Sequence, residues 1–129
     1  MWRPIQHSPG TAALVDALER HVSAEAAAIM RAPFALGDAE ELRALVAGAG
    51  FRDVTIRIAV RMVRFPSPEE FVRRLVAAVP LAGLADAVAR VDVDARAALI
   101  GDVSAALRSY VDDEGLAVPM ESHVVVAQT

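Results

Sequence analysis

The sequence contains no cysteine and no lysine, and only 5% of its residues are aromatic. The absence of cysteine excludes disulfide frameworks, thiol nucleophiles and thiolate metal sites together. All 13 basic residues are arginine, 17 acidic residues outnumber them, and the two signs are interspersed along the chain. The sequence therefore lacks the basic stripe that nucleic-acid-binding proteins present to phosphates, and we predict no nucleic-acid partner.

Long apolar runs are also missing. No run approaches the roughly 20 residues that cross a bilayer, and the Met-Trp-Arg-Pro start lacks the apolar centre of a signal peptide. We therefore expect no membrane partner and a cytoplasmic location. The chain is nevertheless 55% hydrophobic over 129 residues, with a net charge of −4. That composition predicts a single folded domain over residues 1–129 with a real core.

Helical patterns fill much of the sequence. Apolar residues recur three or four positions apart behind Ser8-Pro9, Asp38 and Ser67-Pro68, which are typical helix starts. Asp94 is expected to cap a later helix, and residues 112–115 are expected to form a turn. We expect about five helices. The stretches that have the helical pattern, some of them short, are about 9–22, 23–30, 38–47, 67 to the interruption at Pro80, 84–91 and from Asp94 onward.

Two stretches have strand character instead. From Val54 to Met62 every second residue is apolar, which predicts a half-buried strand over about 53–64. The uninterrupted apolar run 123–127 predicts a strand over about 120–128 that is covered on both faces. Because a helical segment separates the two, they can pair as antiparallel neighbours, and we predict an α+β fold with helices mainly on one side.

Candidate chemistry is sparse. His7, His21 and His123 do not stand three or four residues apart, so the sequence predicts no metal site. Ser122 and His123 are adjacent on a strand and point to opposite faces, which excludes a nucleophile and base pair there. Gly48 and Gly50 follow a helix, which favours helix termination over a phosphate loop. Arg57 and Arg61 share a strand face that either holds an anion or is simply solvated or ion-paired, and we favour the second interpretation. No residue is assigned a catalytic role.

One segment resembles a known family. The helix that starts at Asp38 runs through Glu41, Leu42 and Leu45 to Ala49-Gly50-Phe51 and then into a long strand. This order resembles the closing part of class I S-adenosylmethionine-dependent methyltransferases of the ubiquinone-biosynthesis-like, "type 11" kind, in which such a helix leads into the sixth strand of a seven-stranded sheet.

The resemblance implies a partial Rossmann-like methyltransferase sheet. Trp2-Arg3-Pro4 looks like the end of the family's fifth strand, and His123 to Gln128 looks like its seventh, antiparallel strand. The roughly 50 residues between the two strands look like a helical insertion over the substrate pocket. The family's glycine-rich loop after the first strand and the acidic residue that ends its second strand have no counterpart here. The chain thus looks like the C-terminal half of such an enzyme without its cofactor-binding half.

Two functions are considered, the first implied by the resemblance and the second from a different class. In the first, the chain is the substrate-side portion of a methyltransferase that acts on a small apolar molecule. It is then inactive alone, binds no cofactor by itself, and works with S-adenosylmethionine only when another chain supplies the missing half. In the second, it is a non-catalytic dimeric module that binds a small hydrophobic ligand or a partner protein. The candidate substrate-pocket residues are Trp2, His7, Phe34, Phe65 and Phe71; packing in the core is the alternative for each.

A homodimer is the expected assembly. In the parent fold the strand that resembles 123–128 is interior, and a reduced fifth strand leaves one of its edges unpaired beside Val124, Val125 and Val126. A second copy meeting that edge across a two-fold axis would cover it.

Overall fold

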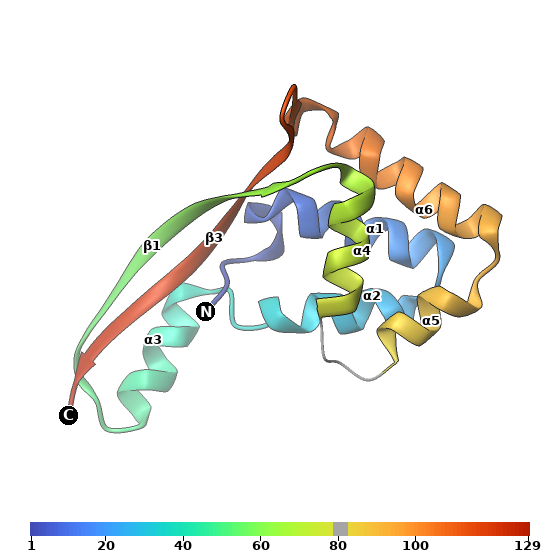
Figure 1. Ribbon diagram of the computed structural model, residues 1–129. Coiled ribbons are helices and arrows are strands. Elements are labelled where there is room, and N and C mark those ends of the chain that lie inside the picture. The colour runs from blue at the N-terminus through green and yellow to red at the C-terminus, as the bar shows by residue number, and fades with distance from the viewer. Residues whose placement is uncertain (79–82) are drawn as a thin grey trace.

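The computed structural model describes residues 1–78 and 83–129 and has the predicted α+β architecture (Figure 1). The helices are α1 (Pro9–His21), α2 (Ala24–Arg31), α3 (Ala39–Gly48), α4 (Pro68–Ala78), α5 (Leu84–Arg90) and α6 (Val93–Ala106). Three single turns of 3-10 helix are η1 (Ile5–His7), η2 (Ala32–Phe34) and η3 (Arg108–Tyr110). The strands are β1 (Arg52–Phe65), β2 (Val111–Asp112) and β3 (Gly115–Gln128).

The sheet is antiparallel with the strand order β1-β3-β2. Ile58 of β1 lies opposite His123 of β3, and Phe65 lies opposite Leu116, so the two strands form one long ladder. The strand expected from residue 120 begins at Gly115, because the alternation of Leu116 and Val118 into the core continues the strand pattern back to the turn. The turn predicted at 112–115 is confirmed, and it joins β2 to β3.

The first three residues also belong to the sheet. Trp2 pairs with Ser122 in an antiparallel bridge, and the Arg3 amide donates to the Glu121 carbonyl oxygen at 3.1 Å. From Glu121 to His123, β3 therefore has β1 on one side and residues 1–3 on the other, whereas β2 lies on that second side at Gly115 and Leu116. Because both neighbours run antiparallel to β3, they run parallel to each other.

The helices occupy the two ends of this ladder (Figure 1). The core is built where α1, α2, α4, α5 and α6 meet the end that carries Phe65, Leu116 and Val118. At the other end, α3 lies beside β1, and midway along the ladder His123 is buried, with its Nε2 donating to the Gly37 carbonyl oxygen at 3.0 Å. Val118 and His123 are an odd number of residues apart, so the two ends are covered on opposite faces.

This division leaves apolar side chains uncovered in two places. The apolar run 123–127 is not covered on both faces as predicted, because Val126 is 59% exposed on the face away from His123. The alternating apolar residues of β1 are covered only near α3, and Ile58, Val60 and Met62 beyond it are at least half exposed. The alternation of apolar and polar residues identifies a strand, but it does not show how much of that strand a helix covers.

The expected helix caps are largely present. The Asp38 carboxylate accepts from the Glu40 amide at 2.8 Å, and the Ser67 hydroxyl accepts from the Glu70 amide at 3.1 Å. The prediction that Asp94 caps α6 is wrong: Asp92 accepts from the Ala95 amide at 2.7 Å, so the helix begins at Val93. Two aspartates two residues apart can each cap, and Asp94 instead lies in the first turn, where the helix dipole also favours a carboxylate.

Close packing of α1 on α4 generates a stability prediction at Gly10. A Cβ at Gly10 would lie 2.8 Å from the Phe71 ring, and that ring is only 1% exposed, so it has little room to move. Gly10→Ala should lower the free energy of unfolding in urea by about 1 to 3 kcal/mol. Gly101→Ala is the matched control, because a Cβ there has nothing within 4 Å, and it should be stabilising by roughly 0.5 to 1 kcal/mol. Equal effects of the two changes would contradict this packing.

An ion-pair cluster joins α1 to α6 and generates a pH prediction. Arg20 Nη1 and His21 Nε2 lie 2.8 and 2.7 Å from the Asp102 carboxylate, and the hydrogen bond from His21, followed by the charge of Arg20, lowers the pKa of Asp102. A lowered carboxyl pKa stabilises the fold above the unfolded value of about 4, and this contribution is lost as the pH falls through the folded pKa.

Asp102→Asn should therefore lower the melting temperature at neutral pH, and the gap to the wild type should close as the pH falls below about 4. Asp16→Asn is the control, because Asp16 is exposed on α1 and forms no ion pair with the described residues. A gap that stays constant down to the acid limit would show that the carboxylate charge is not what joins α1 to α6.

Candidate ligand cavity

A cavity of about 350 Å³ lies between α4, α5 and α6. This volume falls within the range of small-molecule sites in proteins, roughly 300 to 1,000 Å³. Most of its wall is apolar, and charged side chains stand among the lining residues. The described lining residues are Glu69, Val72, Arg73, Val76, Ala77, Ala85, Val88, Arg96, Leu99 and Ile100.

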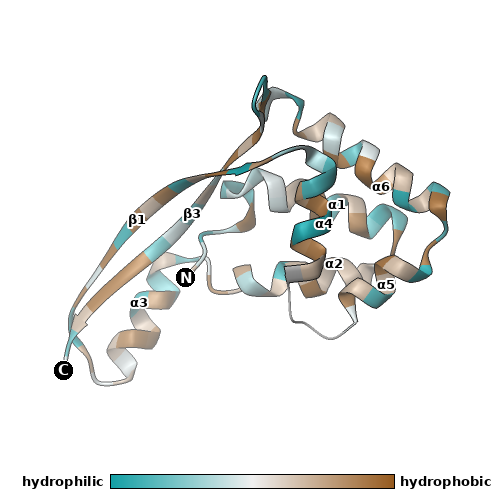
Figure 2. Cartoon of the chain, viewed as in Figure 1, coloured by the Kyte–Doolittle hydropathy of each residue, from teal (hydrophilic) through white to brown (hydrophobic). Residues whose placement is uncertain are grey.

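The amphipathic sequence of α4 builds one wall. Hydrophobic and hydrophilic residues alternate in bands along this helix (Figure 2). Val72 and Val76 are one helical turn apart and almost fully buried, so they form a continuous apolar stripe. Leu99 on α6 is 1% exposed and faces the same cavity, with Ile100 beside it. The cavity is thus a gap in the packing of two apolar helix faces.

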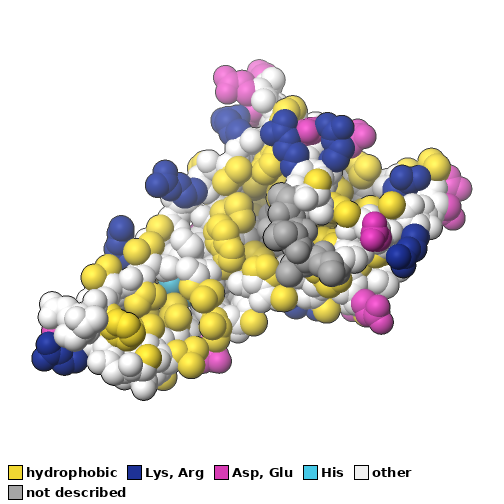
Figure 3. Space-filling view, turned by 60° about the horizontal axis from the view of Figure 1, so that its bottom comes forward, with side chains coloured by type: hydrophobic (Ala, Val, Ile, Leu, Met, Phe, Trp, Pro, Cys, Tyr) yellow, Lys and Arg dark blue, Asp and Glu magenta, His cyan; other side chains and the backbone are white. Residues whose placement is uncertain are grey.

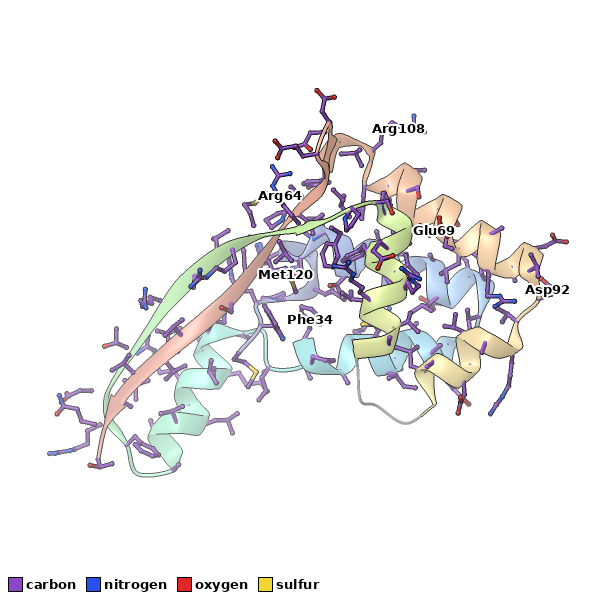
Figure 4. All side chains as sticks on the ribbon, in the orientation of Figure 1. Phe34, Arg64, Glu69, Asp92, Arg108 and Met120 are labelled. Carbon is purple, nitrogen blue, oxygen red and sulfur yellow. The ribbon has the colours of Figure 1, made fainter. Side chains whose placement is uncertain are left out.

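Charged groups on α4 are held in place at the cavity. The Glu70 carboxylate is paired with Arg73, one of the lining residues, and with Arg74, whose Nε lies 2.8 Å from Glu70 Oε1. Hydrogen bonds from Arg74 and then Arg73 lower the pKa of Glu70, so the cluster stays ionised at neutral pH. Glu69, the first acid of α4, lines the cavity itself (Figure 4).

Arg96 and Glu69 are the two lining charges without a charged partner. No opposite charge lies within 4.0 Å of either one among the residues that the structure describes. A guanidinium beside an apolar cavity suits a ligand with an apolar body and an anionic end, since arginine binds carboxylates through paired N–H donors. Glu69, Arg73 and Arg96 are the charged residues of the described lining, which contains no histidine, serine, threonine or tyrosine.

The predicted pocket residues lie elsewhere and form separate groups. Phe65 and Phe71 pack edge to face with ring centroids 5.0 Å apart, and Phe71 belongs to the core. Trp2 and Phe34 form a second pair at 6.1 Å. His7 is near this pair in the sequence, and its Nδ1 lies 3.6 Å from a Glu121 carboxylate oxygen. None of the five residues is among the described residues that line the cavity between α4, α5 and α6.

Phe34 lines a second, more open hollow. Its other described lining residues are Pro4, Ile5, Gln6, Ala28, Arg31, Ala32 and Ala35. The hollow lies where the chain leaves the sheet after residues 1–3, and Trp2 packs against Phe34 beside it. Two of the five candidate residues, Trp2 and Phe34, therefore lie together, whereas Phe65 and Phe71 pack against each other at the core.

Sequence reasoning missed the α4–α5–α6 cavity. Its signal was present only as the apolar spacing of Val72 and Val76, which equally describes a helix packed without gaps. Arg96 offered no separate signal, because an arginine in the first turns of a helix is ordinary. Among the residues described, no three or more His, Asp or Glu side chains are grouped closely enough to hold a metal ion.

Comparisons of the chain with family models, with curated proteins and with solved structures found no match. Among the helices that the structure describes, none has the length and apolar character that a membrane span requires.

The cavity predicts binding of a small apolar anion, with octanoate as the probe. Octanoate should raise the melting temperature in a concentration-dependent manner, because a ligand that binds only the folded state stabilises it. Ala85→Leu should weaken this effect by filling the cavity, and Ala97→Leu, on α6 but outside the lining, should leave it unchanged. Arg96→Gln should weaken octanoate more than octanol. Equal responses of all variants would contradict binding at this site.

Proposed function

We propose that this chain is the substrate-side half of a class I S-adenosylmethionine-dependent methyltransferase, inactive until a cofactor-binding half completes its sheet. The observation that carries the proposal is the place of β3. This strand lies between β1 and residues 1–3 and is antiparallel to both. That is the position which the resemblance implies for the seventh strand, between the fifth and the sixth.

The direction of the neighbouring strands adds support. Residues 1–3 and β1 run parallel, so their carboxyl ends point the same way, and the segments that follow Pro4 and Phe65 build the helices at that end of the ladder (Figure 1). In open α/β sheets, ligands bind beyond the carboxyl ends of parallel strands. The cavity and the hollow beside Phe34 both lie in helices that leave the sheet there, as expected of a substrate-binding layer.

The described residues do not fit the cofactor. A cradle for its carboxylate and ribose needs a glycine-rich turn after a strand, but Gly48 and Gly50 follow a helix. Gly37 is used differently, since a Cβ there would lie 2.6 Å from the Pro4 nitrogen. In this proposal the chain contributes substrate binding and the exclusion of water, and a second polypeptide contributes the cofactor.

A second candidate is a non-catalytic module that binds a small hydrophobic ligand. The observation in its favour is that helices of this chain alone enclose the cavity, with Leu99 and Val72 already buried in its wall. Such a site needs no second polypeptide to bind its ligand. The two candidates differ in whether the free part of the sheet accepts a cofactor-binding half.

Calorimetry separates these candidates. The isolated chain should give no heat with S-adenosylmethionine, and a dissociation constant in the micromolar range would overturn its assignment as a half that lacks the cofactor-binding site.

On mixing with the cofactor-binding half of a type 11 methyltransferase, we expect a complex that binds the cofactor. Val126→Arg, at an exposed position on β3, should weaken that complex, and Val93→Arg, equally exposed on α6, should not. Failure to form any complex at micromolar concentration would favour the ligand-binding module.

A further inference from the structure

We propose that the free edge of β1 pairs with β1 of a second copy of this chain, antiparallel across a two-fold axis centred on Ile58. The inference does not depend on the proposed function. β1 is 14 residues long and, in the part of the chain that the structure describes, has β3 as its only neighbour in the sheet. A long strand with one unpaired edge is a template for another strand.

The edge of β1 has only part of the usual protection against pairing, namely its charged side chains and an irregularity near its start. It contains no proline, and its pairing with β3 is regular from Thr55 to Phe65, with one irregularity between Arg52 and Thr55. Only its beginning is occupied, where Arg43 of α3 donates to the Val54 carbonyl oxygen at 2.6 Å. Beyond that point, the backbone groups of the edge are free to meet another chain.

An exposed apolar face accompanies the free edge. Ile58, Val60 and Met62 share one face of β1 and are 50%, 57% and 61% exposed. Hydrophobic side chains are visible along this arm of the molecule, with basic side chains separate from them (Figure 3). A strand added at the edge would place its own side chains beside these three and bury part of their surface.

The choice of a second copy rests on register. A two-fold axis perpendicular to the sheet pairs residues that are symmetric about the centre. With the centre at Ile58, this residue faces its own copy, Ile56 faces Val60, and Val54 faces Met62. Every directly opposed pair on this face from Val54 to Met62 is then apolar on both sides, as cross-strand packing requires. The edge of β1 is thus complementary to itself.

Neighbouring registers are less favourable. A centre at residue 57 places Arg57 opposite its own copy, and a centre at residue 59 places Arg57 opposite Arg61. Directly opposed like charges are destabilising. A centre at residue 60 places Arg64 opposite Ile56 on the apolar face. The Ile58 register avoids all three pairs.

The Ile58 register does oppose Arg52 to Arg64, but at its two ends. Arg52 lies on the far side of the irregularity in β1, so the regular register does not extend to it. Arg64 is already engaged by its own chain, where it is paired with Asp112 at 3.3 Å and with Glu114 at 3.7 Å, near the β2–β3 turn (Figure 4).

Arginines on the face of β1 opposite Ile58 determine how the proposed dimer should respond to salt. Arg57 and Arg61 are exposed and, among the described residues, have no carboxylate within 4.0 Å. In the Ile58 register they face Ala59 and Thr55 directly, but the four guanidiniums of the two copies become diagonal neighbours. Their mutual repulsion is screened by salt, so the dimer should tighten as ionic strength rises. A partner strand rich in carboxylates would show the opposite dependence.

Cross-linking tests the register, and the cysteine-free chain gives a clean background. Ile58→Cys should form a covalent dimer on oxidation or with a short bifunctional thiol reagent, because position 58 faces itself. Val60→Cys is the matched control, equally exposed on the same face, and should not cross-link, since it faces position 56. Efficient cross-linking at position 60 instead of position 58 would overturn the register.

Sedimentation tests the interface itself. The wild type should be a dimer at micromolar concentration in moderate salt, and Ile58→Lys should be a monomer that keeps its circular dichroism and melting temperature to within a few degrees. Val126→Lys, an exposed position on β3 away from this edge, should remain a dimer. A monomeric wild type, or a dimer that survives Ile58→Lys, would overturn the proposal. Because no cofactor or substrate takes part, failure here leaves the proposed methyltransferase function unaffected.

Discussion

The ladder between β1 and β3 is the constraint on which the rest of the structure depends. Its two strands are separated in the chain by α4, α5 and α6, yet they are paired over nearly their whole length. At one end the ladder contributes Phe65, Leu116 and Val118 to the core, and near its middle it buries His123 under the segment that leads to α3. One continuous pair of strands thus fixes the positions of both helical parts.

Because one ladder supports two helical parts, the stretch of β1 between them remains uncovered. The helices at one end lie on the opposite face from those at the other, and neither set reaches Val60 or Met62. In a domain with helices on one face only, these residues would lie beneath a helix. Here they remain available, and the same exposed stretch is bordered by the free backbone edge of β1. Exposed apolar surface and unpaired backbone groups together mark an interaction surface more strongly than either does alone.

The parts of the fold that could be predicted from sequence are those set by local physics. The alternation from Val54 to Met62, the caps Asp38 and Ser67, and the turn before Gly115 each depend on residues close together in the chain, and the structure contains all of them. Exposure was not predictable in the same way, because it depends on which helix lies over which part of a strand. The same holds for the cavity, because a gap between the packed helices α4 and α6 leaves no mark on the spacing of apolar residues in either one.

Gly115 has a consequence for how the chain folds. Its φ is 115°, and a Cβ there would lie 2.5 Å from the Phe65 carbonyl oxygen, so the start of β3 fits against the end of β1 with only a hydrogen between them. Bringing these two residues together closes a loop that contains three helices. The chain loses conformational entropy when this loop closes, before the hydrogen bonds and side-chain contacts of the β1–β3 ladder can stabilise it. We therefore expect the closure of this loop to be slower than the formation of the local helices. A contact of such long range makes the protein slower to fold than its helical content suggests.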